Sequence, residues 1–285
     1  MSTQCCYVLL RLEYHGSLYG GWQRQGKQGE DLSLPLPSVQ QVVEDAAARV
    51  LNTEFITCAQ VAGRTDKGVH ALDQRCALRV PMTIDIASFA EKMNQQLRDN
   101  LIAVCGADVR RNERFDAVRK CYKYVLQIPR SQDDKRPIKE LRQYSRHEWR
   151  NLDLHRLRSA MQLMEGTHDF QHLSKQKQPK TNTIRTVYAA YVSVAATSDD
   201  LPSFLVASSP AWNLDQHEFW IINVEGSGFL WNQVRRMVSL ALKIAQGDWP
   251  LDSVREVIEG KRVGPGSASA RGLYLHRVWL AGEED

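Results

Sequence analysis

The apolar side chains of this 285-residue chain follow the same order of elements twice: strand, helix, strand, strand, helix, strand. Alternation with a period of two predicts half-buried strands, and apolar spacings of three and four predict amphipathic helices. The first set of predicted elements is residues 6–14, 38–50, 54–61, 74–80, 85–98 and 101–110. The second set is residues 119–128, 153–165, 183–194, 219–225, 230–246 and 273–280, with a short additional helix at 252–258. We therefore expect an α+β fold of two ferredoxin-like (βαββαβ) lobes with antiparallel sheets, residues 1–114 and 115–285, and a cleft between them.

The composition is that of a globular protein, with 43% hydrophobic and 25% charged residues. There is no apolar run of about eighteen residues, so we expect no membrane span. The first ten residues, MSTQCCYVLL, lack the basic region of a signal peptide and fit a first strand better. The six cysteines show neither CxxC pairs nor zinc-finger spacing, which predicts an intracellular, reducing compartment such as the cytoplasm or nucleus.

Positive charge is concentrated in two stretches, although the net charge is only +4. Residues 110–158 hold fifteen Lys or Arg against seven Asp or Glu. Residues 170–187 hold Lys175, Lys177, Lys180 and Arg185 and no acidic residue. A local excess of this kind suits a polyanion such as RNA, because neutralising phosphates releases counterions. The alternative is a solvated basic surface that binds no partner.

The segment VAGRTDKGVHALDQ, residues 61–74, is the most probable place for chemistry in the first half. Gly63 and Gly68 allow a sharp turn that presents Arg64 and Asp66 at a surface. An arginine near a carboxylate favours its charged form, which suits a nucleophile. On composition alone this signal is weak, because Asp-Lys-Gly is an ordinary turn composition and the commoner role of such an aspartate is only to cap a turn.

Two other segments have open interpretations. In HGSLYGGWQRQ, residues 15–25, the aromatic side chains of Tyr19 and Trp22 could stack on unpaired bases or belong to the core. His168 and His172 are four residues apart, a spacing that would suit zinc on a helix, but the sequence suggests no third ligand. We therefore expect no metal.

The segment GRTDKGVHA, residues 63–71, closely resembles the signature of the TruA-type tRNA pseudouridine synthases, the tRNA pseudouridine 38–40 synthase family. Lys67 within it resembles eukaryotic members more than bacterial ones. Other segments resemble the family in the same order along nearly the whole chain: GWQRQ at 21–25, SVQQVVEDA at 38–46, Arg114-Phe115 followed by Tyr122 and Tyr124, GSGFLWNQVRRMV at 226–238 and RGLYLHRV at 271–278. There are two departures from the family. GPGSASA at 264–270 lacks the usual Ala-Pro-Ala, and the loop at 26–37 is longer.

The resemblance implies an isomerase that converts a uridine of tRNA into pseudouridine, in the anticodon stem-loop, with no cofactor. Asp66 would be the nucleophile and Arg64 its neighbour in the substrate cleft of the first lobe. The second lobe would complete the uracil pocket: Tyr122 packs on the uracil, Leu273 forms a wall, and Arg235 pairs with Asp66. Arg236 would then be solvated or face a phosphate.

The resemblance also implies tRNA as the partner and a homodimer. The alternative is a non-catalytic RNA-binding or RNA-folding protein on the same scaffold, which would have no need of Asp66, Arg64 and Arg235 together. A glycoside hydrolase would need a second carboxylate near the loop, and none is evident.

Overall fold

The computed structural model describes residues 5–25, 36–81, 84–98, 101–111, 114–131, 137–148, 150–175, 182–207 and 217–283. The chain forms two compact units, Met1–Val118 with Leu275–Asp285, and Arg119–Tyr274. It passes from one unit to the other twice, within strand β5 (Ala117–Pro129) and within strand β10 (Leu273–Leu280).

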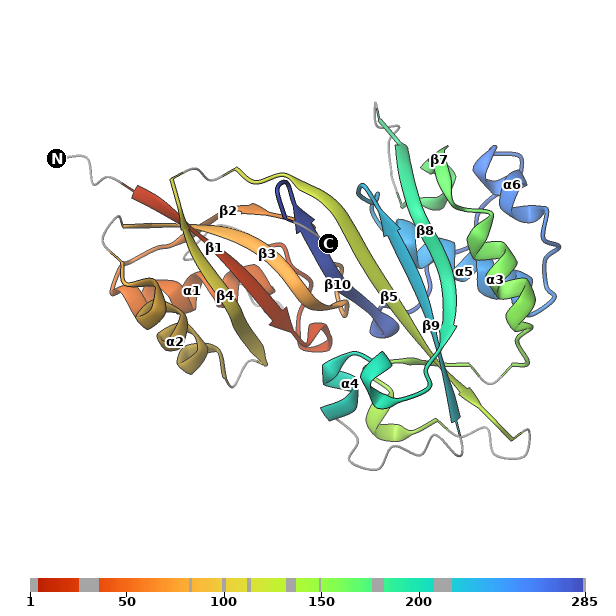
Figure 1. The fold of residues 1–285 in the computed structure, drawn as a ribbon, viewed down its shortest axis with the longest axis horizontal. Helices are drawn as coiled ribbons and strands as arrows, with labels where there is room; N and C mark the ends of the chain where they lie inside the picture. The colour runs from red at the N-terminus through yellow and green to blue at the C-terminus, as the bar shows by residue number, and fades with distance from the viewer. Residues whose placement is uncertain are drawn as a thin grey trace. The chain divides into compact units, whose positions relative to one another are not determined.

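The first unit is built from four strands and two helices in the expected βαββαβ order. These elements are β1 (Cys5–Tyr14), α1 (Val39–Leu51), β2 (Thr57–Val61), β3 (His70–Pro81), α2 (Ile86–Leu97) and β4 (Ile102–Arg110). Their strands run antiparallel in the order β4-β1-β3-β2. Helices α1 and α2 lie together on one face of these strands (Figure 1). The strand order is that of a ferredoxin-like lobe.

Helix α1 begins where the sequence predicts, because the Ser38 side chain accepts a hydrogen bond from the backbone N–H of Gln41 at 3.1 Å. The buried Glu44 then ties this helix to its surroundings. One of its carboxylate oxygens accepts from Arg24 Nε at 2.7 Å, and the other accepts from the backbone N–H of Cys58 at 2.9 Å. Glu44 thus joins α1 both to strand β2 and to the segment that follows β1.

The second unit repeats the order with additions. Besides β5 and the start of β10, its elements are β6 (Arg146–His147), α3 (Leu154–Gln162), β7 (Gly166–Asp169), β8 (Ile184–Val194), α4 (Ser203–Ala207), β9 (His217–Gly226), α5 (Gln233–Ala245) and α6 (Ser253–Ile258). The strands β5-β9-β8-β7 are antiparallel neighbours, and β6 pairs parallel to β5. Helices α3 and α5 pack against each other, and α3 lies against β8 (Figure 1).

Short 3₁₀ turns complete the described elements of both units: Gly16–Leu18, Lys139–Leu141, Gln171–Leu173, Ser198–Asp200 and Ala270–Gly272.

The predicted α+β class with antiparallel sheets is confirmed. Strands β6 and β7 and helix α4 were not predicted. The connection between β8 and β9 contains α4, and its residues 208–216 lie outside the described part of the chain, as do residues 26–35 of the loop at 26–37. The expected division at residue 114 differs from the observed grouping, because residues 275–285 belong with the first unit.

Besides the pairing of β10 with β3, contacts outside the strand ladder attach the C-terminal segment to the first unit. The backbone N–H of Val278 donates to the buried carboxylate of Asp73 at 2.8 Å. The N–H of Ala281 donates to the carbonyl of Asp116 at 2.9 Å, and Glu283 forms an ion pair with Arg75 at 3.3 Å. The first unit therefore contains both the beginning and the end of the chain.

Among the described residues, no helix is both long and apolar enough to cross a membrane.

We expect Glu44→Ala to destabilise the first unit by about 3–5 kcal/mol, because it leaves the Arg24 guanidinium without its buried partner. Asp45→Ala is the matched control, since Asp45 also pairs with Arg24, at 2.9 Å, but its side chain is 43% exposed. We expect about 0–1 kcal/mol for this change. The measurement is urea unfolding of both variants, and equal losses of stability would contradict the role of Glu44.

Candidate active site

The loop between β2 and β3 contains Asp66 and is held at both ends by the backbone. The N–H of Ala62 donates to the carbonyl of Arg75 at 2.8 Å. The N–H of Val69 donates to the carbonyl of Asp66 at 3.1 Å, closing a turn in which Gly68 has φ +83°. Residues with a Cβ rarely adopt the left-handed conformation of Gly68, so the backbone of this turn explains why the motif has a glycine here.

The segment after β1 runs alongside this loop. Gly21 forms an isolated antiparallel bridge with Asp66, and the N–H of Trp22 donates to the carbonyl of Thr65 at 3.0 Å. Gly21 has φ +112°, and a Cβ there would lie 3.0 Å from the Thr65 oxygen and 3.1 Å from the Lys67 nitrogen. Only glycine allows the two backbones to approach this closely.

The side chain of Thr65 anchors the loop to the core of the first unit. It is buried, and its hydroxyl lies 2.8 Å from the hydroxyl of the fully buried Tyr14 on β1. Burial raises the pKa of Tyr14, so this hydroxyl stays protonated. Gln74 Nε2 on β3 donates to the Tyr14 hydroxyl at 3.2 Å and to the Gly63 carbonyl at 2.7 Å. Hydrogen bonds thus hold the backbone that leads into Asp66.

Because Thr65 points inward, its neighbours are more accessible: Arg64 and Lys67 are exposed and Asp66 is half-buried. The first unit therefore brings Arg64 and Asp66 together on one fixed loop, as predicted.

The aromatic residues of the segment at 15–25 belong to the core. Tyr19 and Trp22 are both buried, and the Trp22 ring lies 6.2 Å from the Tyr14 ring, measured between centroids. Burial also raises the pKa of Tyr19 to about 12. Of the two interpretations of these aromatics, the structure supports core packing beneath the loop.

In the second unit, Tyr122 lies on β5 and is largely buried. Its ring packs edge to face on the ring of Phe229, with 5.4 Å between centroids. Two residues earlier on the same strand, Lys120 is half-buried, and burial together with the charge of Arg185 lowers the pKa of its ammonium group. A cation and an aromatic ring thus occupy one side of β5.

Arg235 lies on the first turns of α5 and binds the segment that precedes β10. Its Nε donates to the carbonyl of Ala268 at 2.7 Å, and the N–H of Ala268 donates back to the carbonyl of Arg235 at 3.0 Å. Arg236 differs from expectation: it is half-buried, and its Nη2 donates to the carbonyl of Gly264 at 3.4 Å. Its side chain is therefore used within the unit.

Leu273, at the start of β10, is buried, and the residues before it are fixed by Tyr124. The Tyr124 hydroxyl donates to the carbonyl of Ser269 at 2.9 Å, and burial raises the pKa of Tyr124 to about 12. A Cβ on Gly272 would lie 2.8 Å from the carbonyl oxygen of Val125. The second unit thus brings Arg235, Leu273 and the strand of Tyr122 around one segment, 268–273.

Arg114 is exposed in the first unit, and its neighbour Phe115 is buried there. The side chain of Gln60 on β2 bonds both backbone groups of Phe115, accepting from its N–H at 3.1 Å and donating to its carbonyl at 2.6 Å. Through these two hydrogen bonds, Phe115 attaches the Arg-Phe segment to β2.

The two histidines do not share a helix: His168 lies in β7 and His172 in a 3₁₀ turn. His168 Nε2 lies 2.7 Å from the carbonyl oxygen of Glu165. Among the described residues, no group of three or more His, Cys, Asp or Glu could hold a metal ion.

The family model for tRNA pseudouridine synthase matches residues 160–279 of the chain. The tRNA pseudouridine synthase A of Pseudothermotoga lettingae is 30% identical over 271 residues, which cover 94% of this chain and 96% of the relative. The enzyme of the same name from Thermotoga maritima is 30% identical over 274 residues, with the same coverage, and that of Chlamydia felis is 29% identical over 278 residues, or 95% of this chain and 90% of the relative.

The chain therefore belongs to the tRNA pseudouridine synthase family, and its relatives of that name match it along nearly its whole length. The likeness of Lys67 to eukaryotic members stays a prediction.

We expect Gly21→Ala to reduce activity at least tenfold, because the added methyl group forces the loop of Asp66 away from the first segment. The matched control is Gly106→Ala on β4 of the same unit, where a Cβ would meet only ordinary contacts, 3.5 Å from the Arg11 side chain. The measurement is pseudouridine formation in tRNA by both variants. Full activity of Gly21→Ala would show that the bridge to Asp66 is dispensable.

Proposed function

We propose that this protein uses Asp66 as the nucleophile that converts a uridine of the tRNA anticodon stem-loop, in the class of positions 38–40, into pseudouridine. As a member of its family the protein is an isomerase that acts on tRNA uridine. The observation that carries the assignment of Asp66 is its loop, whose backbone is fixed by buried hydrogen bonds while the carboxylate is left half-buried. A covalent nucleophile needs this combination of fixed position and access.

The reaction begins with the uridine unstacked from its neighbours, because neither its glycosidic bond nor its C5 is reachable inside a helix. Asp66 attacks C6 of the base or C1′ of the sugar. The bond between N1 and C1′ breaks, the uracil turns, and C5 bonds to C1′. The proton on C5 is released and N1 gains one, so the reaction is an isomerisation and needs no cofactor.

The remaining site residues have supporting roles in this proposal. Arg64, on the same loop and exposed, binds the substrate beside Asp66. Tyr122 packs on the uracil and Leu273 closes its pocket against water, while Arg235 supplies a positive charge to the substrate. The Tyr122 ring is already held by Phe229, and Arg235 by Ala268, so both are oriented before the substrate binds.

The alternative is a protein that binds or folds RNA without chemistry. It would need the basic residues but would have no use for a fixed loop that presents a carboxylate, because a carboxylate repels phosphate. The half-buried acidic side chain on a fixed loop therefore favours catalysis.

Asp66→Asn is expected to abolish turnover while tRNA affinity stays within a few-fold, because the amide keeps the shape of the carboxylate but has no anionic oxygen. Asp66→Glu is expected to fail nearly as badly, since one methylene displaces the oxygen by about an ångström. If Asp66 only caps a turn, Asp66→Asn would hardly change the rate of turnover, because asparagine is an equally good turn residue. Release of tritium from 5-tritiated uridine in tRNA, measured in a single turnover, separates the two. Release by Asp66→Asn at the wild-type rate would refute the assignment.

We also propose a homodimer, on the resemblance to bacterial members. The mass measured by light scattering should be about twice the 32.5 kDa of one chain. A monomer with full activity would reject this proposal.

The compartment proposed is intracellular and reducing, in the cytoplasm or nucleus. The five cysteines whose side chains are described are all free thiols, which supports it.

A further inference from the structure

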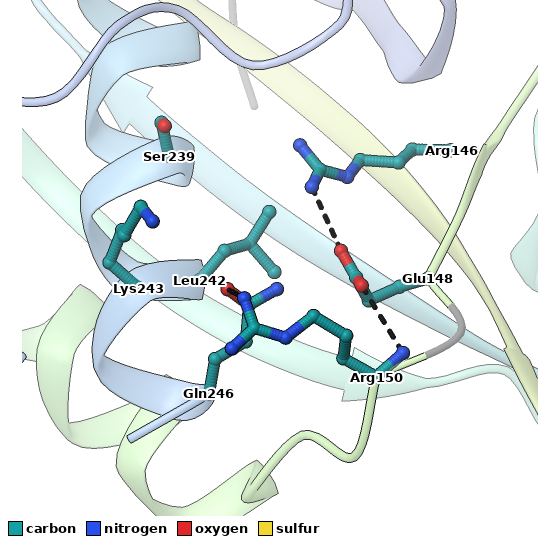
Figure 2. Close-up of a pocket in the computed structure, with 7 residues that line it drawn as sticks. All are labelled: Arg146, Glu148, Arg150, Ser239, Leu242, Lys243 and Gln246. Carbon is teal, nitrogen blue, oxygen red and sulfur yellow. Dashed lines mark hydrogen bonds and ion pairs between the residues drawn. The ribbon is translucent and has the colours of Figure 1, made fainter. Parts of the chain in front are cut away.

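The second unit contains a polar cavity of about 210 Å³ between α5 and the segment around β6, and the proposed reaction does not use it. It is shown in Figure 2 and is lined by Arg146, Glu148, Arg150, Ser239, Lys243 and Gln246, with Leu242 as its one apolar residue. We propose that this cavity binds a backbone phosphate of the substrate RNA. The inference rests on the proposed function, since it takes tRNA as the substrate.

The groups that face the cavity are mainly hydrogen-bond donors. Two guanidinium groups and one ammonium group line it, together with the Ser239 hydroxyl, which makes no hydrogen bond to another described residue. A ligand surrounded by cations and donors must be an anion with acceptor oxygens, and phosphate has that chemistry.

The one carboxylate of the lining does not make the cavity a cation site. Glu148 is buried, and its oxygens accept from Arg146 Nη2 at 2.8 Å and from the backbone N–H of Arg150 at 3.3 Å. The dashed lines in Figure 2 show both bonds. Glu148 is thus occupied in orienting the cations, and one negative charge faces three positive ones.

Asp248 lies beside the cavity and pairs with two of its cations, which we propose also bind the phosphate. It pairs with Arg150 at 2.7 Å and with Lys243 at 3.1 Å, and these partners lower the pKa of the carboxyl to about 2. The Asp248 side chain is 27% exposed, so solvent and ions reach its contacts with both cations. The carboxylate therefore competes with the anion for Arg150 and Lys243.

The position of the cavity points to RNA and not to a free anion. Ser239 and Gln246 follow Arg235 on α5 by four and eleven residues, which places all three within about 40° of one face of the helix. Along the axis they lie about 6 Å and about 16 Å beyond Arg235. Arg235 is proposed to contact the substrate nucleotide, so a strand that continues along this face of α5 brings its next phosphates to the cavity.

The chain offers a matched control for each change, because the ion pair of Lys243 with Asp248 has a counterpart in Lys261 with Glu259 in the same unit. The measurement is the dissociation constant of tRNA as a function of salt concentration. Lys243→Gln should lower the slope of log affinity against log salt by about 0.7 to 0.9, and Asp248→Asn should tighten binding several-fold. Lys261→Gln and Glu259→Gln should change neither quantity. Equal effects in the two pairs would overturn the proposal, because they would reflect net charge alone.

A second measurement identifies the source of the phosphate. Single phosphates of an anticodon-arm RNA are replaced by uncharged methylphosphonates, and each RNA is bound to wild-type protein, to Lys243→Gln and to Ser239→Glu. We expect one position where the replacement weakens binding to the wild type but not to either variant. If no position shows this coupling, the proposal is wrong. Competition by inorganic phosphate without such coupling would mean that the cavity takes a free anion instead. Both measurements report binding, whereas tritium release tests the chemistry, so failure of one proposal is distinguishable from failure of the other.

Discussion

The buried contact between the hydroxyls of Thr65 and Tyr14 is the interaction on which the first unit's site depends. The position of the Asp66 side chain depends on the backbone that carries it. Thr65 anchors that backbone to β1, Gln74 anchors Gly63 to β3, and Gly21 lets the neighbouring segment reach Asp66. All the anchors are on regular strands or in direct contact with one, which is how a rigid scaffold places a loop residue accurately.

The periodicity of apolar residues predicted the order of the elements well, because each long strand or helix carries its own pattern. It missed β6 and β7, which have two and four residues, too few to show a period. Gly166 illustrates the limit: the helix ends before it, as a glycine after a helical pattern predicts, but the pattern does not show that Gly166, with φ +107°, begins a strand. The strand exists because it pairs with β8, a partner about twenty residues away.

The site was predictable as far as it is written in one short motif. Arg64 and Asp66 are predicted as site residues because they lie in a motif between Gly63 and Gly68, whereas nothing in the sequence indicates that Tyr14 and Gln74 bond the loop. At Trp22 the sequence could instead have suggested a site residue that is none. An aromatic ring in a polar segment is compatible both with stacking on RNA bases and with packing in the core. Only the distance to Tyr14 decides it. In the second unit, Arg235 and Tyr124 bind the carbonyls of Ala268 and Ser269, so the absence of the usual Ala-Pro-Ala before β10 leaves these contacts intact.

The two passages of the chain between its units have a consequence for how the protein is made. A ribosome delivers residues in order, and domains at the N-terminus commonly fold while the rest is still being synthesised. The first unit cannot finish in that way, because the partners of Asp73, Asp116 and Arg75 lie in the last eleven residues. Until β10 has been made, the part of β3 that pairs with it has an open edge, which other chains can pair with. Completion of the Asp66 unit thus waits for residues 275–283, which are made after the whole second unit, and a chain that lacks them loses the partners of Asp73, Asp116 and Arg75.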